Sequence, residues 1–303
     1  MELRELRMFV TVAEKGGMSA AARVLHISQP ALSQTINALE RELGVRLLVR
    51  SSTGVTPTEE GRTLLAEARA VLARYDQALR TMAAHTGDGG GVLRLGIPLE
   101  LPSGLLGPPL EQLSLTSPAT RVQVRHLSTA AQLAALRAGE LDAGLLRERP
   151  AGPEFDAMLV VREHLGVLLA AEQAAELAGP EGVRLDALGG LEWVSFPRSG
   201  SPAWYDELTA ILRGHGLDLG PAAPEGQELI AEVKLAAVGS GRAFALAPPN
   251  WSQPLPESIT WSPLVGHPLV RRTWVVWPAG SRRRDLARFV GGFRDPDDAL
   301  SGS

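Results

Sequence analysis

The chain has 303 residues, of which 45% are hydrophobic and 21% charged, so it is a folded protein long enough for two or three domains. It contains no cysteine, which excludes disulfide scaffolds, thiolate zinc sites, cysteine nucleophiles and thiol-based redox sensing. The net charge is −4, but residues 1–58 hold seven cations and five anions, a balance of +2 against −6 for the rest. This asymmetry has the right sign for DNA binding and is too small to establish it.

No run of about 18 apolar residues exists, so no membrane-spanning helix is expected. The N-terminal segment is charged and amphipathic, and it lacks the apolar core and small-residue cleavage site of a signal peptide. We therefore expect a cytoplasmic protein with no membrane partner.

Two helices are predicted at the start of the chain. Apolar residues recur at helical spacing over residues 3–15, and Gly16 stops this helix. Ser19 is expected to cap a short second helix over residues 20–25.

A third helix carries most of the chemical information. Ser28 is expected to cap it, Pro30 fits its first turn, and Gly44 ends it after Leu43. Its apolar residues fall on one stripe. The opposite face carries small polar and basic side chains, namely Ser33, Gln34, Asn37 and Arg41.

Residues 45–58 predict two short strands, and Thr58 is expected to cap a long helix over residues 59–84. The apolar residues of that helix form one stripe near heptad spacing. Such a stripe must be buried on something, and a second copy of the helix is the simplest partner. Residues 87–91, rich in glycine, predict a flexible linker.

Beyond the linker, strands and helices alternate, which predicts an α/β fold with a mostly parallel sheet in two lobes. The predicted strands cover residues 92–97, 121–127, 143–146, 165–170, 192–196, 243–246 and 273–277. The predicted helices cover residues 105–113, 130–138, 202–215, 229–238 and 286–293.

The first 58 residues therefore predict a helix-turn-helix followed by a β-wing. Glutamine can bond adenine through two hydrogen bonds, serine can bond bases or phosphate, proline can touch a thymine methyl, and the helix N-terminus attracts phosphate. A wing arginine suits a phosphate or the minor groove. The candidate DNA-binding residues are Ser28, Gln29, Pro30, Ser33, Gln34, Asn37 and Arg50. The alternative is a generic helical hairpin with a solvated polar face.

Most of residues 3–61 also match one known pattern. The matching residues are 6–14, 19–25, 27–36, 39–40, 43–44 and 47–48, with Arg50, Gly54, Thr58 and Gly61. With them the segment resembles the N-terminal DNA-binding domain of LysR-type transcriptional regulators. The departures lie in and beside the wing, at Val49, Thr53, Pro57 and Glu60. The lack of a cation at position 53 removes one possible phosphate contact.

The rest of the chain resembles the same family more loosely, through residues 93–97, 136–145, 238–241, 245–248 and 269–293. The resemblance implies an effector domain of two lobes, like a periplasmic binding protein. The implied domains are residues 1–58 for DNA binding, 59–91 for dimerisation and linker, and 92–303 for the effector. Within the last, lobe I takes 92–161 and 268–303, and lobe II takes 162–267.

Ligands of such sheets bind beyond the carboxyl ends of strands, in the cleft between lobes. This selects Pro98, Glu100, Ser103, Ser128, Thr129, Pro197, Arg198 and Ser199 as candidate effector-binding residues. Ser128 and Thr129 suit a small anion, and Arg198 a carboxylate. Glu100 favours a cationic or hydroxylated ligand. Together with Arg198 it suits a zwitterion, or the two side chains pair with each other.

The sequence thus predicts a ligand-responsive transcription regulator and no enzyme. The expected partners are double-stranded promoter DNA, a second copy through residues 59–84, a small-molecule effector and RNA polymerase, and two such dimers are expected to form a tetramer. We expect no cofactor beyond a non-covalent co-inducer, and the scattered histidines show no metal-ligand spacing. The alternatives are a solute-binding protein and an enzyme built on the α/β half.

Overall fold

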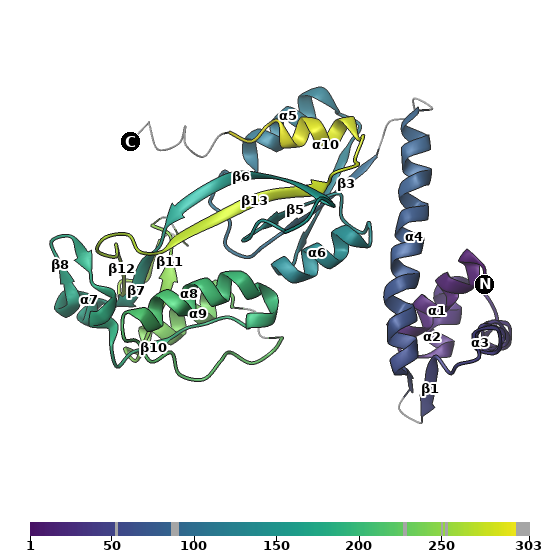
Figure 1. The fold of residues 1–303 in the computed structure, drawn as a ribbon, viewed down its shortest axis with the longest axis horizontal. Helices are drawn as coiled ribbons and strands as arrows, with labels where there is room; N and C mark the ends of the chain where they lie inside the picture. Colours follow the sequence, from purple (N-terminus) through teal and green to yellow (C-terminus); the bar gives the residue numbers. More distant parts are fainter. Residues whose placement is uncertain (52–53, 86–90, 227–228, 250, 252–253, 295–303) are drawn as a thin grey trace. The chain divides into compact units, whose positions relative to one another are not determined.

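The computed structural model describes residues 1–51, 54–85, 91–226, 229–249, 251 and 254–294 (Figure 1). These residues form two compact units, one with the elements α1 to α4 and one with the elements β3 to α10. Two sequence features lie outside the described residues. They are the position of Thr53 and most of the glycine-rich linker.

The N-terminal unit has the predicted helix-turn-helix and wing. Its elements are α1 (Leu3–Lys15), α2 (Met18–Leu25), α3 (Gln29–Leu43), β1 (Leu48–Ser51), β2 (Gly54–Pro57) and α4 (Glu59–His85). The prediction for α2 was wrong in its start and its cap, because the helix begins at Met18 and Gly17 is its N-cap residue. Ser19 cannot cap the helix from within, and its hydroxyl instead donates to Gln29 Oε1 at 3.2 Å.

One apolar cluster holds the first three helices and the wing together. Phe9, Val12, Leu32, Ile36 and Leu39 are fully buried in it. Full burial of each such side chain contributes about 1.5–3 kcal/mol. The small side chains at positions 21 and 22 are also buried, which lets α2 and α3 cross closely.

The first half of α4 packs against α1. Ala68 and Leu72 are buried with Leu6 of α1. Two exposed ion pairs lie beside this contact, between Arg7 and Asp76 at 2.7 Å and between Arg69 and Glu14 at 2.8 Å. The apolar stripe of α4 is therefore only partly covered within one chain.

Each lobe of the C-terminal unit is built on a sheet of four or five strands. The lobe I sheet has the order β4-β3-β5-β13-β6, and the lobe II sheet has the order β10-β11-β7-β12. The lobe I strands are β3 (Val92–Ile97), β4 (Arg121–His126), β5 (Ala143–Leu146), β6 (Phe155–His164) and β13 (Val270–Pro278). The lobe II strands are β7 (Gly166–Ala170), β10 (Glu192–Trp193), β11 (Ala243–Ala247) and β12 (Ile259–Ser262).

The expectation of mostly parallel sheets was wrong. The strand β13 runs antiparallel to both β5 and β6, and β7 runs antiparallel to both β11 and β12. The physical reason is the route of the chain, which leaves lobe I along β6 and returns along β13. These two strands pair with each other from Phe155↔Pro278 to His164↔Val270 (Figure 1). Residues 162–164 thus pair with β13, before the chain enters lobe II at β7.

Helices cover both faces of the lobe I sheet. The helices α5 (Gly107–Thr116) and α10 (Arg284–Val290) lie together on one face, and α6 (Thr129–Arg137) lies on the other (Figure 1). Successive side chains of β13 point to opposite faces of the sheet, so Val275 packs toward α5 and α10 while Val276 packs toward α6.

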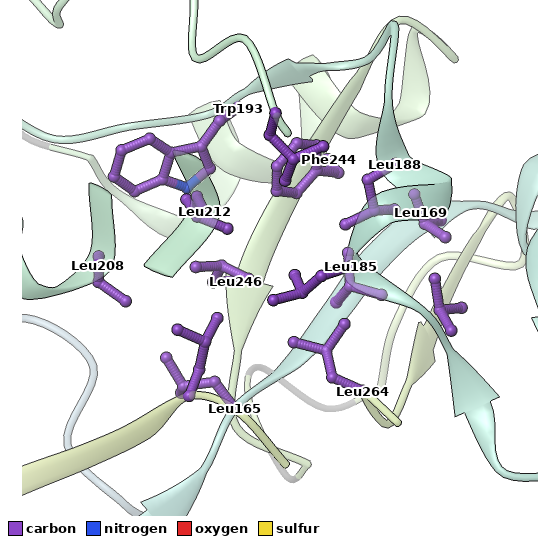
Figure 2. Packing of buried hydrophobic residues seen from close by; sticks show 14 of the residues in the cluster. Leu165, Leu169, Leu185, Leu188, Trp193, Leu208, Leu212, Phe244, Leu246 and Leu264 are labelled. Atoms are coloured by element: carbon purple, nitrogen blue, oxygen red, sulfur yellow. The ribbon is translucent and has the colours of Figure 1, made fainter. Parts of the chain in front are cut away.

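Lobe II has a core of its own. Leu169 on β7, Phe244 on β11 and Leu212 on α8 (Pro202–Gly214) are fully buried in it (Figure 2). The helix α9 (Ala231–Gly239) packs on β7 and β11.

Several lobe II elements were missed or misplaced in the sequence analysis. The missed ones include α7 (Ala171–Leu177), β8 (Ala178–Gly179), β9 (Gly182–Val183) and the short 3₁₀ helices at Leu185–Leu188 and Arg198–Gly200. The strand predicted over residues 192–196 is only Glu192–Trp193. These elements are too short for hydrophobic periodicity to reveal them.

A buried glutamine explains two glycines of the family-like motifs. The Gln132 side chain on α6 donates to the carbonyls of Leu127 at 2.9 Å and Leu145 at 3.0 Å. A Cβ at Gly96 would lie 2.7 Å from Gln132 Oε1, and one at Gly144 would lie 2.6 Å from it. A side chain at either of these two neighbouring strand positions would therefore displace the buried Gln132 side chain.

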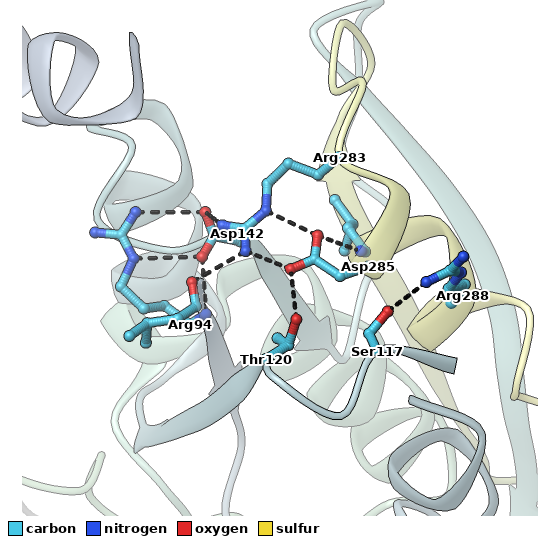
Figure 3. A network of polar contacts seen from close by, with 9 residues as sticks. Arg94, Ser117, Thr120, Asp142, Arg283, Asp285 and Arg288 are labelled. Carbon is cyan, nitrogen blue, oxygen red and sulfur yellow. Dashed lines mark hydrogen bonds and ion pairs between the residues drawn. The ribbon is translucent and has the colours of Figure 1, made fainter. Parts of the chain in front are cut away.

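A network of charged side chains ties the strands of lobe I to α10 (Figure 3). Asp142 is buried, accepts from the Arg94 backbone N–H at 2.8 Å, and forms an ion pair with Arg283 at 2.9 Å. Arg283 also pairs with Asp285 at 2.7 Å and donates to the Val92 carbonyl at 3.1 Å. Burial alone would raise the pKa of Asp285, but the hydrogen bond and charge of Arg283 outweigh it and hold that pKa below its usual range.

We expect Asp285→Asn to lower the free energy of unfolding of the effector half by about 1–2 kcal/mol near neutral pH, after allowance for partial solvent access. A carboxyl with a depressed folded-state pKa stabilises above its unfolded-state pKa of about 3.9 and loses that contribution as the pH falls through the folded value. The difference between wild type and variant should therefore be constant down to about pH 5 and shrink below about pH 4. Urea unfolding followed by tryptophan fluorescence measures it, and a difference that persists at pH 2 would contradict the role given to Asp285.

Candidate nucleic-acid interface and effector cleft

The N-terminal end of α3 is exposed and held by its cap. The Ser28 hydroxyl accepts from the Ala31 N–H at 3.3 Å, and Pro30 occupies the first turn. Ser28, Gln29 and Pro30 are all exposed. Because a helix N-terminus carries unpaired N–H groups and a partial positive charge, this end is suited to a phosphate.

The wing arginine lies on the outer face of α3. One Arg50 nitrogen donates to Ser33 Oγ at 3.1 Å and the other to Asn37 Oδ1 at 3.0 Å. Ser33 and Asn37 are one helical turn apart, so the guanidinium follows the helix face. The structure thus brings together three predicted residues, and Gln34 is exposed on the same helix.

Beside Arg50 the surface is hollowed at the carboxyl end of α3. The hollow is lined by Gln34, Asn37, Glu40, Arg41, Gly44, Val45, Arg46 and Arg50. Three arginines face it. They give this surface a positive potential that the net charge of the whole chain conceals.

The hollow's one carboxylate, Glu40, is turned inward and fixes the wing. Glu40 is 9% exposed, and its Oε1 accepts from the N–H groups of Leu47 at 2.8 Å and Leu48 at 3.1 Å. On the other side of the wing, Thr58 caps α4, since its hydroxyl accepts from the Gly61 N–H at 2.9 Å. A Cβ at Gly61 would lie 2.0 Å from the Leu47 carbonyl oxygen, so this close approach requires glycine.

We expect Glu40→Leu to destabilise the N-terminal unit by about 2–4 kcal/mol, because two buried N–H groups lose their acceptor. Glu40→Gln keeps an acceptor oxygen and should lose clearly less. Far-UV circular dichroism during urea unfolding is the measurement, since all tryptophans lie in the other unit. Equal losses for the two variants would contradict the role of Glu40 in placing the wing.

A second site lies between the lobes, around Glu100. This residue follows β3 in lobe I and has a left-handed φ of 61°. Its Oε1 accepts from Lys234 Nζ on α9 of lobe II at 2.5 Å, and its Oε2 lies 3.3 Å from Arg271 on β13. Arg271 also pairs with Glu163 at 3.0 Å. Lys234 and Arg271 are buried.

Arg147 completes this buried charge cluster. It follows β5 and donates to the carbonyls of Leu99 at 2.9 Å and Glu100 at 2.6 Å, and to the Thr273 hydroxyl at 2.6 Å. Burial lowers the pKa of Arg147 to about 9, and the neighbouring charge of Arg271 adds to this effect. Arg147 therefore stays charged at neutral pH. Burial also lowers the pKa of Lys234, against the opposing effect of Glu100.

Of the other predicted cleft residues of lobe I, Thr129 contacts this cluster through the Arg147 backbone. Pro98 is buried directly after β3. Thr129 is buried, and its hydroxyl accepts from the Arg147 N–H at 3.3 Å. The Ser128 hydroxyl accepts from the Ala131 N–H at 3.3 Å at the start of α6. Ser103 is exposed on the following loop.

The side chains of two lobe II candidates, Arg198 and Ser199, have partners within lobe II. A Cβ at Gly200 would lie 3.3 Å from the Ser128 Cβ, so this loop faces the start of α6. Of the two alternatives for Arg198, the pair with Glu100 is wrong, because the exposed Arg198 binds Asp206 at 2.7 and 2.8 Å. Ser199 bonds Glu225, and Pro197 is half-buried in the preceding turn.

Sequence reasoning missed the cations of the cleft. Lys234, Arg147 and Arg271 were not singled out, although each interrupts an apolar segment. A lysine inside a helix of alanine, valine and leucine was the clearest signal, because the chain has only two lysines. Glu163, the partner of Arg271, lies near the end of strand β6, which was not predicted, so this pair was missed as well.

Comparison with known proteins identifies the family. The family model described as bacterial regulatory helix-turn-helix protein, lysR family, matches residues 3–62, and the model for the LysR substrate binding domain matches residues 86–295. The chain belongs to the LysR family. The family, the fold class and the function predicted from the sequence are thereby confirmed, so this LysR-family member is a DNA-binding transcriptional regulator with an effector-binding domain.

Individual relatives match over nearly the full length. The chain is 31% identical over 292 residues to YnfL of Escherichia coli strain K12, an uncharacterized HTH-type transcriptional regulator, covering 95% of this chain and 96% of YnfL. The crystal structure of CbnR, a LysR family transcriptional regulator, matches with a TM-score of 0.70 at 26% identity, over 97% of this chain and 98% of CbnR. Full-length CbnR in complex with its target DNA matches with a TM-score of 0.68 at 26% identity, over 97% and 99%.

Two further properties concern only the part of the chain that the structure describes. There, no helix combines the length and the apolar character needed to cross a membrane. Histidine, aspartate and glutamate side chains in the same residues form no group of three suited to a metal ion.

Proposed function

We propose that this LysR-family regulator reads its operator with the exposed start of α3 and with Arg50 of the wing. The observation that supports this is the position of Arg50 on the outer face of α3, bonded to Ser33 and Asn37. In this proposal Gln29 and Gln34 bond base edges in the major groove, and Pro30 contacts a thymine methyl. The Ser28 end of the helix meets a phosphate.

Arg50 is the residue expected to move on binding. Its two partners are neutral oxygens on the protein surface, and a phosphate offers it a stronger, charge-assisted hydrogen bond. Exchange of these partners would release Ser33 and Asn37 for contacts of their own with the DNA. The same arginine thus organises the free surface and binds the backbone in the complex.

The direct test is fluorescence anisotropy of the purified protein with DNA from upstream of its own gene, against a scrambled duplex, over a series of salt concentrations. Tight binding that resists competitor and has a steep negative salt slope supports the proposal, since each neutralised phosphate adds about 0.9 to that slope. Absence of binding even at low salt would contradict it.

We expect Arg50→Ala and Gln29→Ala to weaken DNA binding in different ways. Arg50→Ala should weaken binding to specific and scrambled DNA alike and reduce the salt slope by about 1. Gln29→Ala should cost about 1–3 kcal/mol on the specific site only, since it removes a base contact. Arg184→Ala, at an exposed arginine of the effector half, is the matched control and should change neither quantity. A uniform loss with Gln29→Ala would contradict base reading by this residue.

The proposal includes a dimer formed through α4. Val71, Tyr75, Leu79 and Met82 are 46%, 40%, 52% and 63% exposed, and they follow one another three or four residues apart. Such a stripe covers one side of a helix. Val71 and Tyr75 lie beside the part that packs on α1, and Leu79 and Met82 lie beyond it. A second copy of α4 is the proposed partner, and it would place two helix-turn-helix units on a two-fold site.

We expect Leu79→Glu to shift the protein from dimer to monomer and to abolish tight operator binding, because a buried carboxylate would lie in the proposed helix pair. Sedimentation velocity over a concentration series measures the change. Leu115→Glu, at a leucine of α5 that is 77% exposed, is the control and should leave the α4 dimer intact. A Leu79→Glu protein that sediments like wild type would contradict dimerisation through this stripe.

Further parts of the proposal concern the effector and the assembly. A small molecule held without covalent bonds between the lobes would change the spacing of the DNA heads, with no other cofactor. Paired effector domains would give a tetramer that bends its promoter, and RNA polymerase is the further partner of an activator. Because its target is promoter DNA, we place the protein in the cytoplasm. A turnover assay tests the alternative that the α/β half is an enzyme.

A further inference from the structure

The cleft between the lobes already holds a carboxylate, which the chain itself supplies. Glu100 reaches from lobe I to Lys234 of lobe II at 2.5 Å, and its other oxygen lies 3.3 Å from Arg271. The side chains of Lys234 and Arg271 are 4% and 6% exposed, and that of Glu100 is 17% exposed. Glu100 is thus bound as a ligand carboxylate would be, by two buried cations from opposite lobes.

The charges around Glu100 do not balance. Among the residues that the structure describes, Arg147, Lys234 and Arg271 act on one another and on Glu100 and Glu163, which makes three cations against two carboxylates. The hydrogen bonds of Arg147 go to carbonyl and hydroxyl oxygens. A buried cation without a counter-ion is costly, so this cluster attracts any carboxylate that can reach it. Without Glu100 the excess of positive charge would double.

The backbone is arranged to present Glu100. Its φ of 61° is a conformation that favours glycine, and a residue with a Cβ adopts it only where its surroundings enforce it. Arg147 enforces it here by donating to the carbonyls of Leu99 and Glu100. The strained backbone conformation of Glu100 therefore goes together with the position of its carboxylate between the lobes.

We propose that Lys234 and Arg271 form a binding site for one carboxylate, which we call the carboxylate seat. Glu100 occupies this seat and so holds lobe II against lobe I as a latch. The effector is an organic carboxylate that displaces Glu100 from the seat. The part that concerns the effector rests on the proposed function. The seat and the latch do not, because they can be measured without DNA.

A tryptophan reports on the seat. Lys234 Nζ lies 4.6 Å from the centre of the Trp251 ring, close enough for a cation–π contact. Movement of Lys234 toward or away from its carboxylate partner changes the field on this indole. Tryptophan fluorescence and thermal unfolding therefore give two independent readouts of the same event.

The experiment replaces the tethered carboxylate by a free one. Glu100→Ala opens the seat, and sodium acetate is titrated into the full-length variant at constant ionic strength maintained with sodium chloride. We expect the variant to have a lower Tm than wild type. Acetate should raise that Tm by a constant increment for each tenfold rise in concentration above half-saturation, as mass action requires. The tryptophan fluorescence should return toward that of wild type over the same range.

Three controls make the result specific. Acetamide has the shape of acetate without the charge and should not rescue Glu100→Ala. Glu207→Ala removes the partner of Arg272 in an exposed ion pair between the lobes, at 3.4 Å, and should not respond to acetate. Adding Lys234→Met to Glu100→Ala removes half of the seat and should abolish the response. Wild type should not respond either, because its tethered carboxylate has the higher effective concentration.

The proposal is overturned if acetate affects Glu100→Ala no more than chloride or acetamide does, or if Glu207→Ala responds equally. Should Glu100→Ala fail to fold in chloride, its yield on refolding in acetate, chloride and acetamide gives the same comparison. Operator binding by each variant is measured separately by anisotropy. Rescue of Glu100→Ala by acetate, together with a wild-type protein that binds no operator DNA even at low salt, would refute the proposed function and leave the carboxylate seat standing.

Discussion

A buried charge must keep its partner, and this constraint fixes the parts of the molecule on which function depends. Glu40 is buried in the N-terminal unit, and the hydrogen bonds that it accepts from Leu47 and Leu48 place the wing against α3. Asp142 is buried in lobe I, and its two arginines tie the strands to α10. Glu100 is enclosed between the lobes, and its partners join lobe I to lobe II. Breaking such a pair is costly because it leaves one charge uncompensated.

The DNA-binding surface follows from this arrangement. Once Glu40 and Thr58 have set the two ends of the wing, Arg50 can lie along α3 and bond Ser33 and Asn37. The recognition helix α3 is stabilised largely by its own residues, since Ser28 and Gly44 cap it and Leu32, Ile36 and Leu39 of its inner stripe are fully buried. The precision of the interface therefore depends on the loop between α3 and the wing rather than on the helix.

The effector half uses the same principle for a different purpose. Its two lobes have separate apolar cores, and the paired strands β6 and β13 connect them. Apolar packing within each lobe leaves the angle between the lobes open, and in our proposal the ion pair between Glu100 and Lys234 across the cleft sets it. A ligand that competes for one member of that pair could shift the lobes without disturbing either core.

The sequence by itself determined the features that depend on neighbouring residues. The caps at Ser28, Gly44 and Thr58 and the inner stripe of α3 depend on residues within a few positions of each other, so periodicity and side-chain chemistry predict them. The tertiary structure alone decided which distant charges meet. Glu100 pairs with Lys234, 134 residues away, and Arg198 pairs with Asp206 and not with Glu100. Antiparallel pairing of β6 with β13 was likewise hidden, because strand direction depends on the route of the chain through both lobes.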